Sequence, residues 1–140
     1  MSIPTQPWTV DHIGIAVHDI DTAIAHYSLT AGTSVTHREQ LVDRGVELAF
    51  LNTGGTRLEL LMPLRDDTPI ARFLAKEGPG LHHICYKVDD IKAELSRLEK
   101  LGSQLIDTAP RPGAHGTIIA FIQPTSFFGT LTELCEYTNT

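Results

Sequence analysis

The sequence predicts an α+β fold made of two consecutive βαβββ modules within one domain over residues 8–140. Three observations support this prediction: a repeated motif, the alternation of apolar residues in each copy, and the elements that follow each copy. The motif x-His-Ile-x-φ-x-Val-x-Asp-Ile, in which φ is apolar, occurs at residues 11–20 and again 71 positions later at 82–91. Because this offset is about half of the 140 residues, it indicates an internal duplication. The modules then span 8–63 and 80–137, joined by a linker at 64–79.

Each module begins with a strand that is followed by a helix. Ile13, Ile15 and Val17 alternate with other residues at period two, which is typical of a strand and places His12 on the opposite face. The second copy places His83 in the same way. Each helix has an aspartate available as N-cap and ends at a glycine. The candidate caps are Asp19 or Asp21 and Asp89 or Asp90, and the glycines are Gly32 and Gly102.

Three further strands complete each module. In the first module we expect them at 34–42, 45–52 and 56–62, with Gly54 and Gly55 in a hairpin turn. In the second module we expect them at 104–106, 117–122 and 130–137. The linker contains a short helical stretch at 70–76.

Composition and charge exclude several classes of partner. Eleven basic and seventeen acidic side chains give a net charge of −6, which disfavours nucleic acid and anionic membrane surfaces. The first residues show no leader segment and no stretch is long and apolar enough for a membrane span, so we expect a cytoplasmic protein without a membrane partner. Cys85 and Cys135 each lie in an apolar run, which indicates buried, reduced thiols.

Two repeated histidines and two strand carboxylates predict a metal site. If the modules pair about a pseudo-twofold axis, His12 and His83 point into the same cleft. Glu59 and Glu133 lie among apolar residues of the last strand of each module, where a carboxylate requires a partner. A divalent cation bound by these four side chains satisfies both carboxylates and leaves open coordination positions. His82 points to the other face by strand alternation and is interpreted as structural. The histidines interpreted as surface residues are His18, His26 and His37.

Several segments beyond the candidate ligands are equally distinctive. They are RLELLMPL at 57–64, GLHHIC at 80–85, VDDI at 88–91 and GAHG at 113–116. Together with the two motif copies, they resemble the methylmalonyl-CoA epimerases of the vicinal oxygen chelate superfamily over about residues 10–137. The resemblance implies a glyoxalase-like fold, in which paired modules form a cupped mixed sheet around a metal-binding cleft. It also implies a divalent metal, either cobalt or manganese with nickel or zinc as alternatives, an acyl-CoA substrate and a homodimer.

The implied reaction interconverts the R and S epimers at C2 of methylmalonyl-CoA. Removing the C2 proton and returning one to the opposite face passes through an enolate, which a metal stabilises, and requires one base on each face. By motif, His12, His83 and Glu133 match the family's metal ligands. Glu59 occupies the remaining ligand position, where some epimerases have Gln. Glu133 also matches one of the two bases.

The second base has two candidates. The resemblance points to Asp43 in Asp-Arg-Gly-Val, where the family usually has the longer Glu. Glu47, four residues further on, is expected on the same strand face and is the alternative. His115 is a candidate either to contact the substrate carboxylate or to hold its own loop.

Two departures from the family pattern bear on the substrate. Gln-Pro-Thr at 123–125 replaces the usual His-Pro-Lys, and Phe-Phe-Gly at 127–129 is bulkier than the small residues expected there. Two other functions therefore stay open within the superfamily. One is a glyoxalase I type isomerase, and the other is a metal-free protein that sequesters a ligand.

Overall fold

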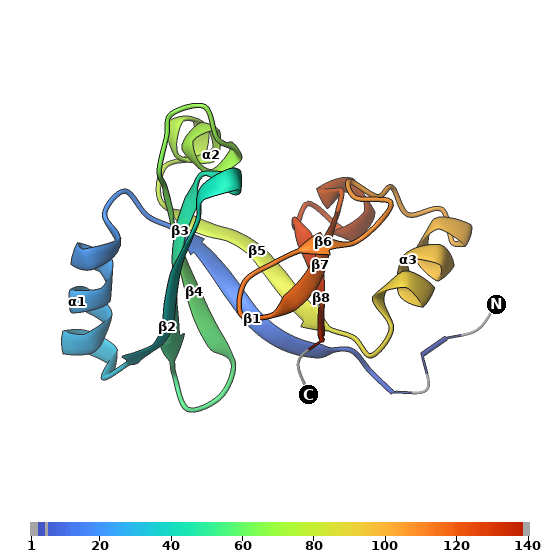
Figure 1. The fold of residues 1–140 in the computed structure, drawn as a ribbon, viewed down its shortest axis with the longest axis horizontal. Helices are drawn as coiled ribbons and strands as arrows, with labels where there is room; N and C mark the ends of the chain where they lie inside the picture. The colour runs from blue at the N-terminus through green and yellow to red at the C-terminus, as the bar shows by residue number, and fades with distance from the viewer. Residues whose placement is uncertain (1–2, 5, 139–140) are drawn as a thin grey trace. The chain divides into compact units, whose positions relative to one another are not determined.

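The computed structural model describes residues 3, 4 and 6–138, and it divides into two compact units (Figure 1). Unit 1 comprises Met1–Asp11 with His83–Thr140, and unit 2 comprises His12–His82. Each unit holds one βαβββ arrangement. The unit boundaries fall inside the first strand of each arrangement, so each of these two strands contributes a few residues to the other unit.

Unit 2 contains the first βαβββ arrangement. Its strands follow the order β2-β3-β4-β1, in which β1 is parallel to β4 and the other neighbours are antiparallel. Helix α1 covers one face of this sheet (Figure 1). The elements are β1 (Thr9–Ala16), α1 (Ile20–Ala31), β2 (Ser34–Leu41), the short 3₁₀ turn η1 (Val42–Arg44), β3 (Val46–Asn52), β4 (Arg57–Pro63) and α2 (Pro69–Glu77).

Local sequence explains where α1 begins and ends. Of the two candidate caps, Asp19 is the one used, because its carboxylate accepts hydrogen bonds from the backbone N–H groups of Asp21 and Thr22 at 3.0 and 3.2 Å. Gly32 ends the helix in the left-handed conformation, with φ of 69°. The helix packs onto the sheet through a buried cluster of Ile20, Ala49, Leu51 and Leu60.

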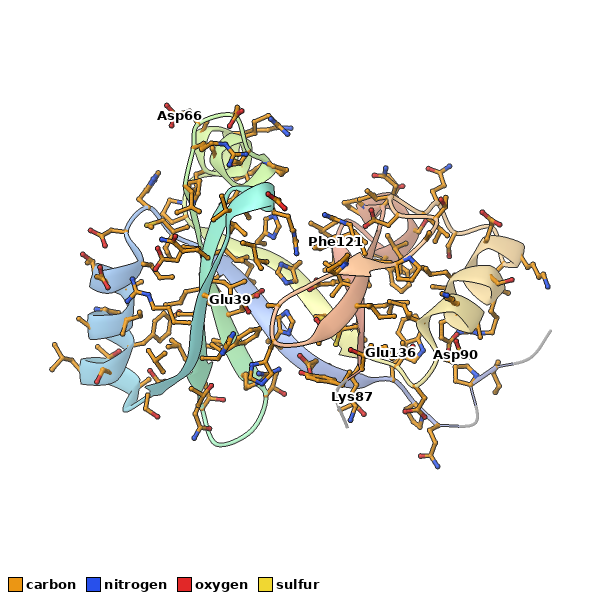
Figure 2. All side chains as sticks on the ribbon, in the orientation of Figure 1. Glu39, Asp66, Lys87, Asp90, Phe121 and Glu136 are labelled. Carbon is orange, nitrogen blue, oxygen red and sulfur yellow. The ribbon has the colours of Figure 1, made fainter. Side chains whose placement is uncertain are left out.

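Unit 1 contains the second arrangement, with strand order β5-β8-β7-β6 and β5 parallel to β8. Asp90 caps α3 by accepting from the N–H of Ala93, and the Glu136 carboxylate accepts from the N–H of Ile91; Figure 2 labels both acidic residues. The core of unit 1 joins α3 to the sheet through Leu95, Leu98 and Leu134. The elements are β5 (Gly80–Lys87), α3 (Ile91–Lys100), β6 (Arg111–Pro112), β7 (Thr117–Ile122), the 3₁₀ turn η2 (Pro124–Phe127) and β8 (Thr132–Tyr137).

The strand expected at 104–106 is wrong. Within 104–106 only Leu105 makes a single bridge, to Ile122. The strand on the edge of β7 away from β8 is Arg111–Pro112. Asp107 explains the interruption, because its carboxylate accepts the Phe121 N–H at 2.8 Å while the Asp107 N–H donates to the Phe121 carbonyl. A side chain thus takes the place of a backbone partner, and the ladder stops there.

The remaining predicted elements lie close to their expected positions, and each module has the predicted order of strand, helix and three strands. Cys85 and Cys135 are buried and free, as expected from the sequence. In the part of the chain that the structure describes, no helix is long and apolar enough to cross a membrane.

Candidate metal centre and catalytic residues

In unit 2, His12 and Glu59 form a buried pair on the sheet face opposite α1. Each is 5% exposed, and His12 Nε2 lies 3.3 Å from Glu59 Oε1. Phe50 lies directly across from Glu59 in the β3/β4 register, and its ring contacts the His12 ring edge-on, with centroids 5.1 Å apart. Strand alternation explains this face, because Ala49 and Leu51 on either side of Phe50 belong to the core under α1.

Unit 1 repeats this arrangement with His83 and Glu133. The two side chains are 4% and 5% exposed, and His83 Nε2 lies 3.1 Å from Glu133 Oε1. Phe121 lies directly across from Glu133 in the β7/β8 register and contacts the His83 ring edge-on, with centroids 5.8 Å apart. Each unit therefore has the same set of a histidine, a glutamate and a phenylalanine.

The donor set fits a divalent metal ion. A buried carboxylate is destabilised unless it pairs with a cation or a strong hydrogen-bond donor. In both units the facing group is an imidazole, and imidazole and carboxylate together are good ligands for first-row divalent metals. All four candidate ligands are buried, so their ligand atoms are shielded from solvent water. They are His12, Glu59, His83 and Glu133.

The two phenylalanines lie outside the repeated histidine motif, which does not predict them. Ala-Phe-Leu at 49–51 and Ala-Phe-Ile at 120–122 have the same offset of 71 residues as the histidine motif. Extending the repeat beyond the first strand therefore finds Phe50 and Phe121. Their edge-on contacts restrict the orientation of each imidazole ring.

The other histidines separate from this set largely as predicted. His82 lies half-buried against the Phe73 ring of α2, with centroids 5.0 Å apart, so it makes a structural contact. His18 and His26 are exposed. His37 is half-buried, and its Nε2 lies 2.7 Å from Glu39 Oε1.

The two candidates for the second base lie in different settings. Asp43 is exposed within the η1 turn and does not lie on a strand. The expectation that Asp43 and Glu47 share one strand face is therefore wrong. Glu47 lies on β3 and points to the α1 side of the sheet, since it alternates with Val46 and Leu48 and pairs with Met62 of the α1-facing core. The side chain of Glu47 is thus on the opposite sheet face from the His12–Glu59 pair.

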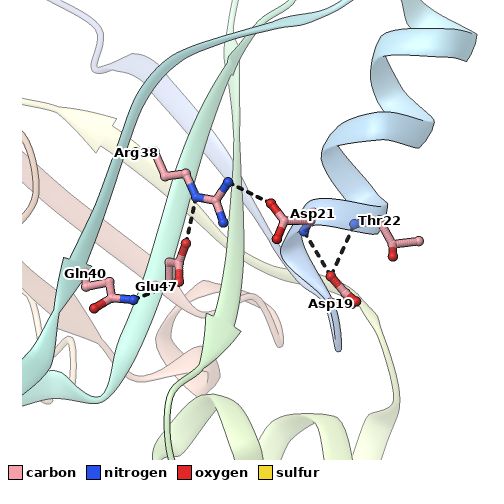
Figure 3. A network of polar contacts seen from close by, with 6 residues as sticks. All are labelled: Asp19, Asp21, Thr22, Arg38, Gln40 and Glu47. Atoms are coloured by element: carbon pink, nitrogen blue, oxygen red, sulfur yellow. Dashed lines mark hydrogen bonds and ion pairs between the residues drawn. The ribbon is translucent and has the colours of Figure 1, made fainter.

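Glu47 belongs to a network of polar contacts that is structural in character (Figure 3). Its carboxylate accepts hydrogen bonds from Gln40 at 3.1 Å and from Arg38 at 2.6 Å, and Arg38 also donates to Asp21 of α1 at 2.8 Å. The hydrogen bonds from Gln40 and Arg38 hold the pKa of Glu47 below its ordinary value. Both carboxylate oxygens are already engaged, which makes Glu47 a poor proton acceptor.

His115 lies at the tip of a tight loop between β6 and β7. Its φ is 58°, a left-handed conformation that non-glycine residues rarely adopt and that is often found at functional positions. The loop is narrow because the Gly113 N–H donates to the Thr117 carbonyl and the Thr117 hydroxyl donates to the Ala114 carbonyl. A Cβ atom at Gly113 would collide with Ile119 and Thr117, so only glycine fits there.

Cys85 and Cys135 form a second group of possible ligand atoms in unit 1. With Asp11 they place three such atoms within 4.8 Å of one another. Burial raises the pKa of the Cys85 thiol, which disfavours the thiolate that metal binding requires. The hydroxyl of Tyr137 donates to Asp11 at 2.7 Å, so the carboxylate already has a partner. The histidine and glutamate pairs are therefore the stronger ligand candidates.

Comparison with known proteins places these features in a family. Residues 11–121 match the model of the Glyoxalase/Bleomycin resistance protein/Dioxygenase superfamily. The ethylmalonyl-CoA/methylmalonyl-CoA epimerase of Cereibacter sphaeroides is 41% identical over 127 residues, which cover 89% of this chain and 95% of that protein. The chain belongs to the methylmalonyl-CoA epimerase family.

Solved structures support the same placement. The methylmalonyl-CoA epimerase from Mycobacterium tuberculosis superimposes with a TM-score of 0.91 at 35% identity, covering 99% of this chain and 94% of that one. A methylmalonyl-CoA epimerase in complex with methylmalonyl-CoA and NH4+ superimposes with a TM-score of 0.88 at 36% identity, covering 95% and 96%. The family resemblance and the glyoxalase-like α+β fold predicted from the sequence are thus confirmed.

Proposed function

We propose that this protein interconverts the R and S epimers at C2 of methylmalonyl-CoA. The observation that supports this most strongly is the matched pair of buried His–Glu sets, one in each unit, in a chain of the epimerase family. The C. sphaeroides relative is named for ethylmalonyl-CoA as well as methylmalonyl-CoA, so the substrate class is a short-chain alkylmalonyl-CoA.

In this proposal His12, Glu59, His83 and Glu133 bind one divalent ion, cobalt or manganese. Two neutral imidazoles and two carboxylates give the occupied site a net charge of zero, which suits a buried position. When bound, the ion supplies a Lewis acid for the negative charge that develops on the thioester oxygen. Phe50 and Phe121 keep the surroundings of the imidazoles apolar and so strengthen these electrostatic interactions.

Two side chains move the proton in this proposal. Glu133 accepts the C2 proton on one face of the substrate and returns one to that face in the reverse direction. Asp43 does the same on the other face, and its exposed turn leaves the carboxylate accessible to substrate. Glu47 is set aside because of its sheet face and its engaged oxygens. His115 contacts the substrate carboxylate from its loop.

Proton NMR of methylmalonyl-CoA in deuterated water, with added cobalt, tests the proposal. The parent protein should replace the C2 proton by deuterium in either epimer and interconvert the two. Asp43→Asn should keep the metal and stop net epimerisation, yet still wash deuterium into one epimer, because Glu133 remains on its face.

Glu47→Gln is the matched control, since it also removes a carboxylate from the same hairpin. It should epimerise at close to the parent rate under conditions in which it is folded. If Glu47→Gln stops the reaction and Asp43→Asn does not, the assignment of the second base is wrong. A parent protein that binds no divalent metal and exchanges no C2 proton contradicts the proposed function as a whole.

The protein acts as a homodimer in this proposal, as the family resemblance implies. Sedimentation equilibrium checks this, with an expected mass of twice the 15.4 kDa of the chain.

A further inference from the structure

The η1 turn that carries Asp43 is fastened to the loop at 64–68, which connects β4 to α2. We propose that Arg65 is a positioning residue: it holds the η1 turn, and with it the Asp43 carboxylate, for proton transfer on one face of the substrate. This inference rests on the proposed function, because it assigns Arg65 a role only through Asp43.

Arg65 joins the loop to the turn through two hydrogen bonds. Its Nη1 donates to the Val42 carbonyl at 3.0 Å, and its Nε donates to the Asp67 carboxylate at 3.0 Å. The planar guanidinium is therefore oriented by Asp67 while it contacts the residue immediately before Asp43. The same Val42 carbonyl accepts the Gly45 N–H at 3.0 Å, which closes the turn. One carbonyl thus receives both the bond that shapes the turn and the bond that fastens it.

A second contact lies at the other end of the turn. The Leu64 N–H donates to the Gly45 carbonyl at 2.8 Å. Gly45 has φ of 66°, and a Cβ atom there would collide with the Thr68 methyl group and the Arg65 guanidinium. The backbone of the turn therefore packs directly against the loop, at a position where only glycine fits.

The loop itself has a rigid base. Thr68 is 1% exposed, its hydroxyl donates to the Arg65 carbonyl at 3.1 Å, and the same oxygen caps α2 by accepting the Ala71 N–H at 3.1 Å. Asp66, between Arg65 and Asp67, is exposed and points outward from the loop (Figure 2). Arg65 thus extends toward η1 from a loop that α2 holds in place.

The turn lies outside the apolar core of unit 2. None of its three residues is buried, so no apolar side chain anchors it to the core of unit 2. The Arg65 and Asp67 side chains are 47% and 77% exposed, and an ion pair this exposed contributes little to folding stability. Proton transfer, in contrast, is sensitive to position, since a displacement of about 1 Å in a catalytic group lowers the rate by about 100-fold. The contact therefore matters more for placing Asp43 than for stability.

Arg65→Ala tests the inference with separately prepared C2 epimers in deuterated water. Proton removal from the epimer that depends on Asp43 should slow by about 10-fold or more, whereas deuterium wash-in on the Glu133 face, metal content and the unfolding midpoint stay at parent values. Arg72→Ala is the matched control, because Arg72 bonds the Asp67 carbonyl at 3.4 Å from α2 without contacting η1. Arg72→Ala should leave the rates of proton exchange on both faces of the substrate unchanged.

The double variant Arg65→Ala/Asp43→Asn distinguishes a role through Asp43 from an effect on the whole site. If Arg65 acts through Asp43, the double variant should exchange deuterium at the rate of Asp43→Asn alone. Arg65→Lys, which keeps a donor for the Val42 carbonyl, should recover part of the lost rate. Equal slowing on both faces, or a further loss in the double variant, overturns the inference. A parent protein without C2 exchange overturns the proposed function instead, so the two failures are distinguishable.

Discussion

Three buried glutamates of this chain show how the partner of a carboxylate decides its role. Glu47 faces the Arg38 guanidinium and a Gln40 amide, so it is held ionised and its oxygens are saturated. Glu59 and Glu133 each face an imidazole, which is a ligand as readily as a hydrogen-bond donor. A permanently charged guanidinium favours a structural ion pair, whereas an imidazole leaves the carboxylate able to bind a metal.

Glu47→Gln should destabilise the fold without removing activity. The variant places an amide beside the donors of Arg38 and Gln40, so at neutral pH it should lower the free energy of unfolding by about 1–3 kcal/mol. Because the pKa of Glu47 is lowered from 4.5 in the folded state, its stabilisation is present above pH 4.5 and is lost as the pH falls through the folded value. The difference between parent and variant should therefore shrink in acid.

Urea unfolding at pH 7 and below pH 4 measures this difference. Glu99→Gln, on the exposed side of α3, is the control and should change stability little at either pH. A difference that grows in acid would mean that the Glu47 carboxylate is not the stabilised form.

At the scale of elements, period-two alternation separates structure from chemistry. On β3, Ala49 and Leu51 face the helix, while Phe50 faces the histidine. This separation, and the helix caps, could be predicted from the sequence because both depend on neighbouring residues. The η1 turn could not, since its partner Arg65 lies 23 residues from Val42 and an unbroken hairpin is the simpler local reading. The absence of the strand expected at 104–106 could not be predicted either, because it depends on the Asp107 side chain, which ends the ladder.

Gly45→Ala should destabilise the protein more than Gly54→Ala does. Both glycines have positive φ, 66° and 85°, so both variants carry a strain of about 1–2 kcal/mol. A Cβ atom at Gly54 meets nothing within 4 Å, whereas one at Gly45 collides with Thr68 and Arg65. Gly45→Ala should therefore cost about 1–3 kcal/mol more, and it alone should slow proton transfer on the Asp43 face. Equal losses of unfolding free energy in the two variants would show that the loop at 64–68 yields freely.

At the scale of the whole molecule, the duplication explains which site residues a sequence reveals. The offset of 71 residues relates the histidines and also the phenylalanines, because the strands that carry them are spaced alike. The glutamates are 74 residues apart, since the η2 turn adds three residues between β7 and β8. Glu59 and Glu133 are therefore found from their apolar strand context and not from the repeat. Contacts that arise only in three dimensions, such as that of Arg38 with Asp21, leave no such trace.

The proposed sharing of one ion between the two repeats makes a distinct prediction about metal content. If one ion uses ligands from both, His12→Ala and His83→Ala should each lose all of the metal, whereas two independent sites would leave each variant with half of it. His82→Ala should keep the metal, because His82 packs on Phe73. Metal analysis of the purified variants measures this.

Unfolding temperature gives an independent readout of the same sharing. A ligand that binds only the folded chain stabilises it by about 2.7 kcal/mol at 100 times its Kd, so cobalt should raise the Tm of the chelator-treated parent and of His82→Ala. The same cobalt concentration should not raise the Tm of His12→Ala or of His83→Ala, because the loss of one imidazole weakens the binding of the shared ion. A full response in either variant would mean that the remaining ligands suffice, and that the histidines of the two repeats do not act on a common ion.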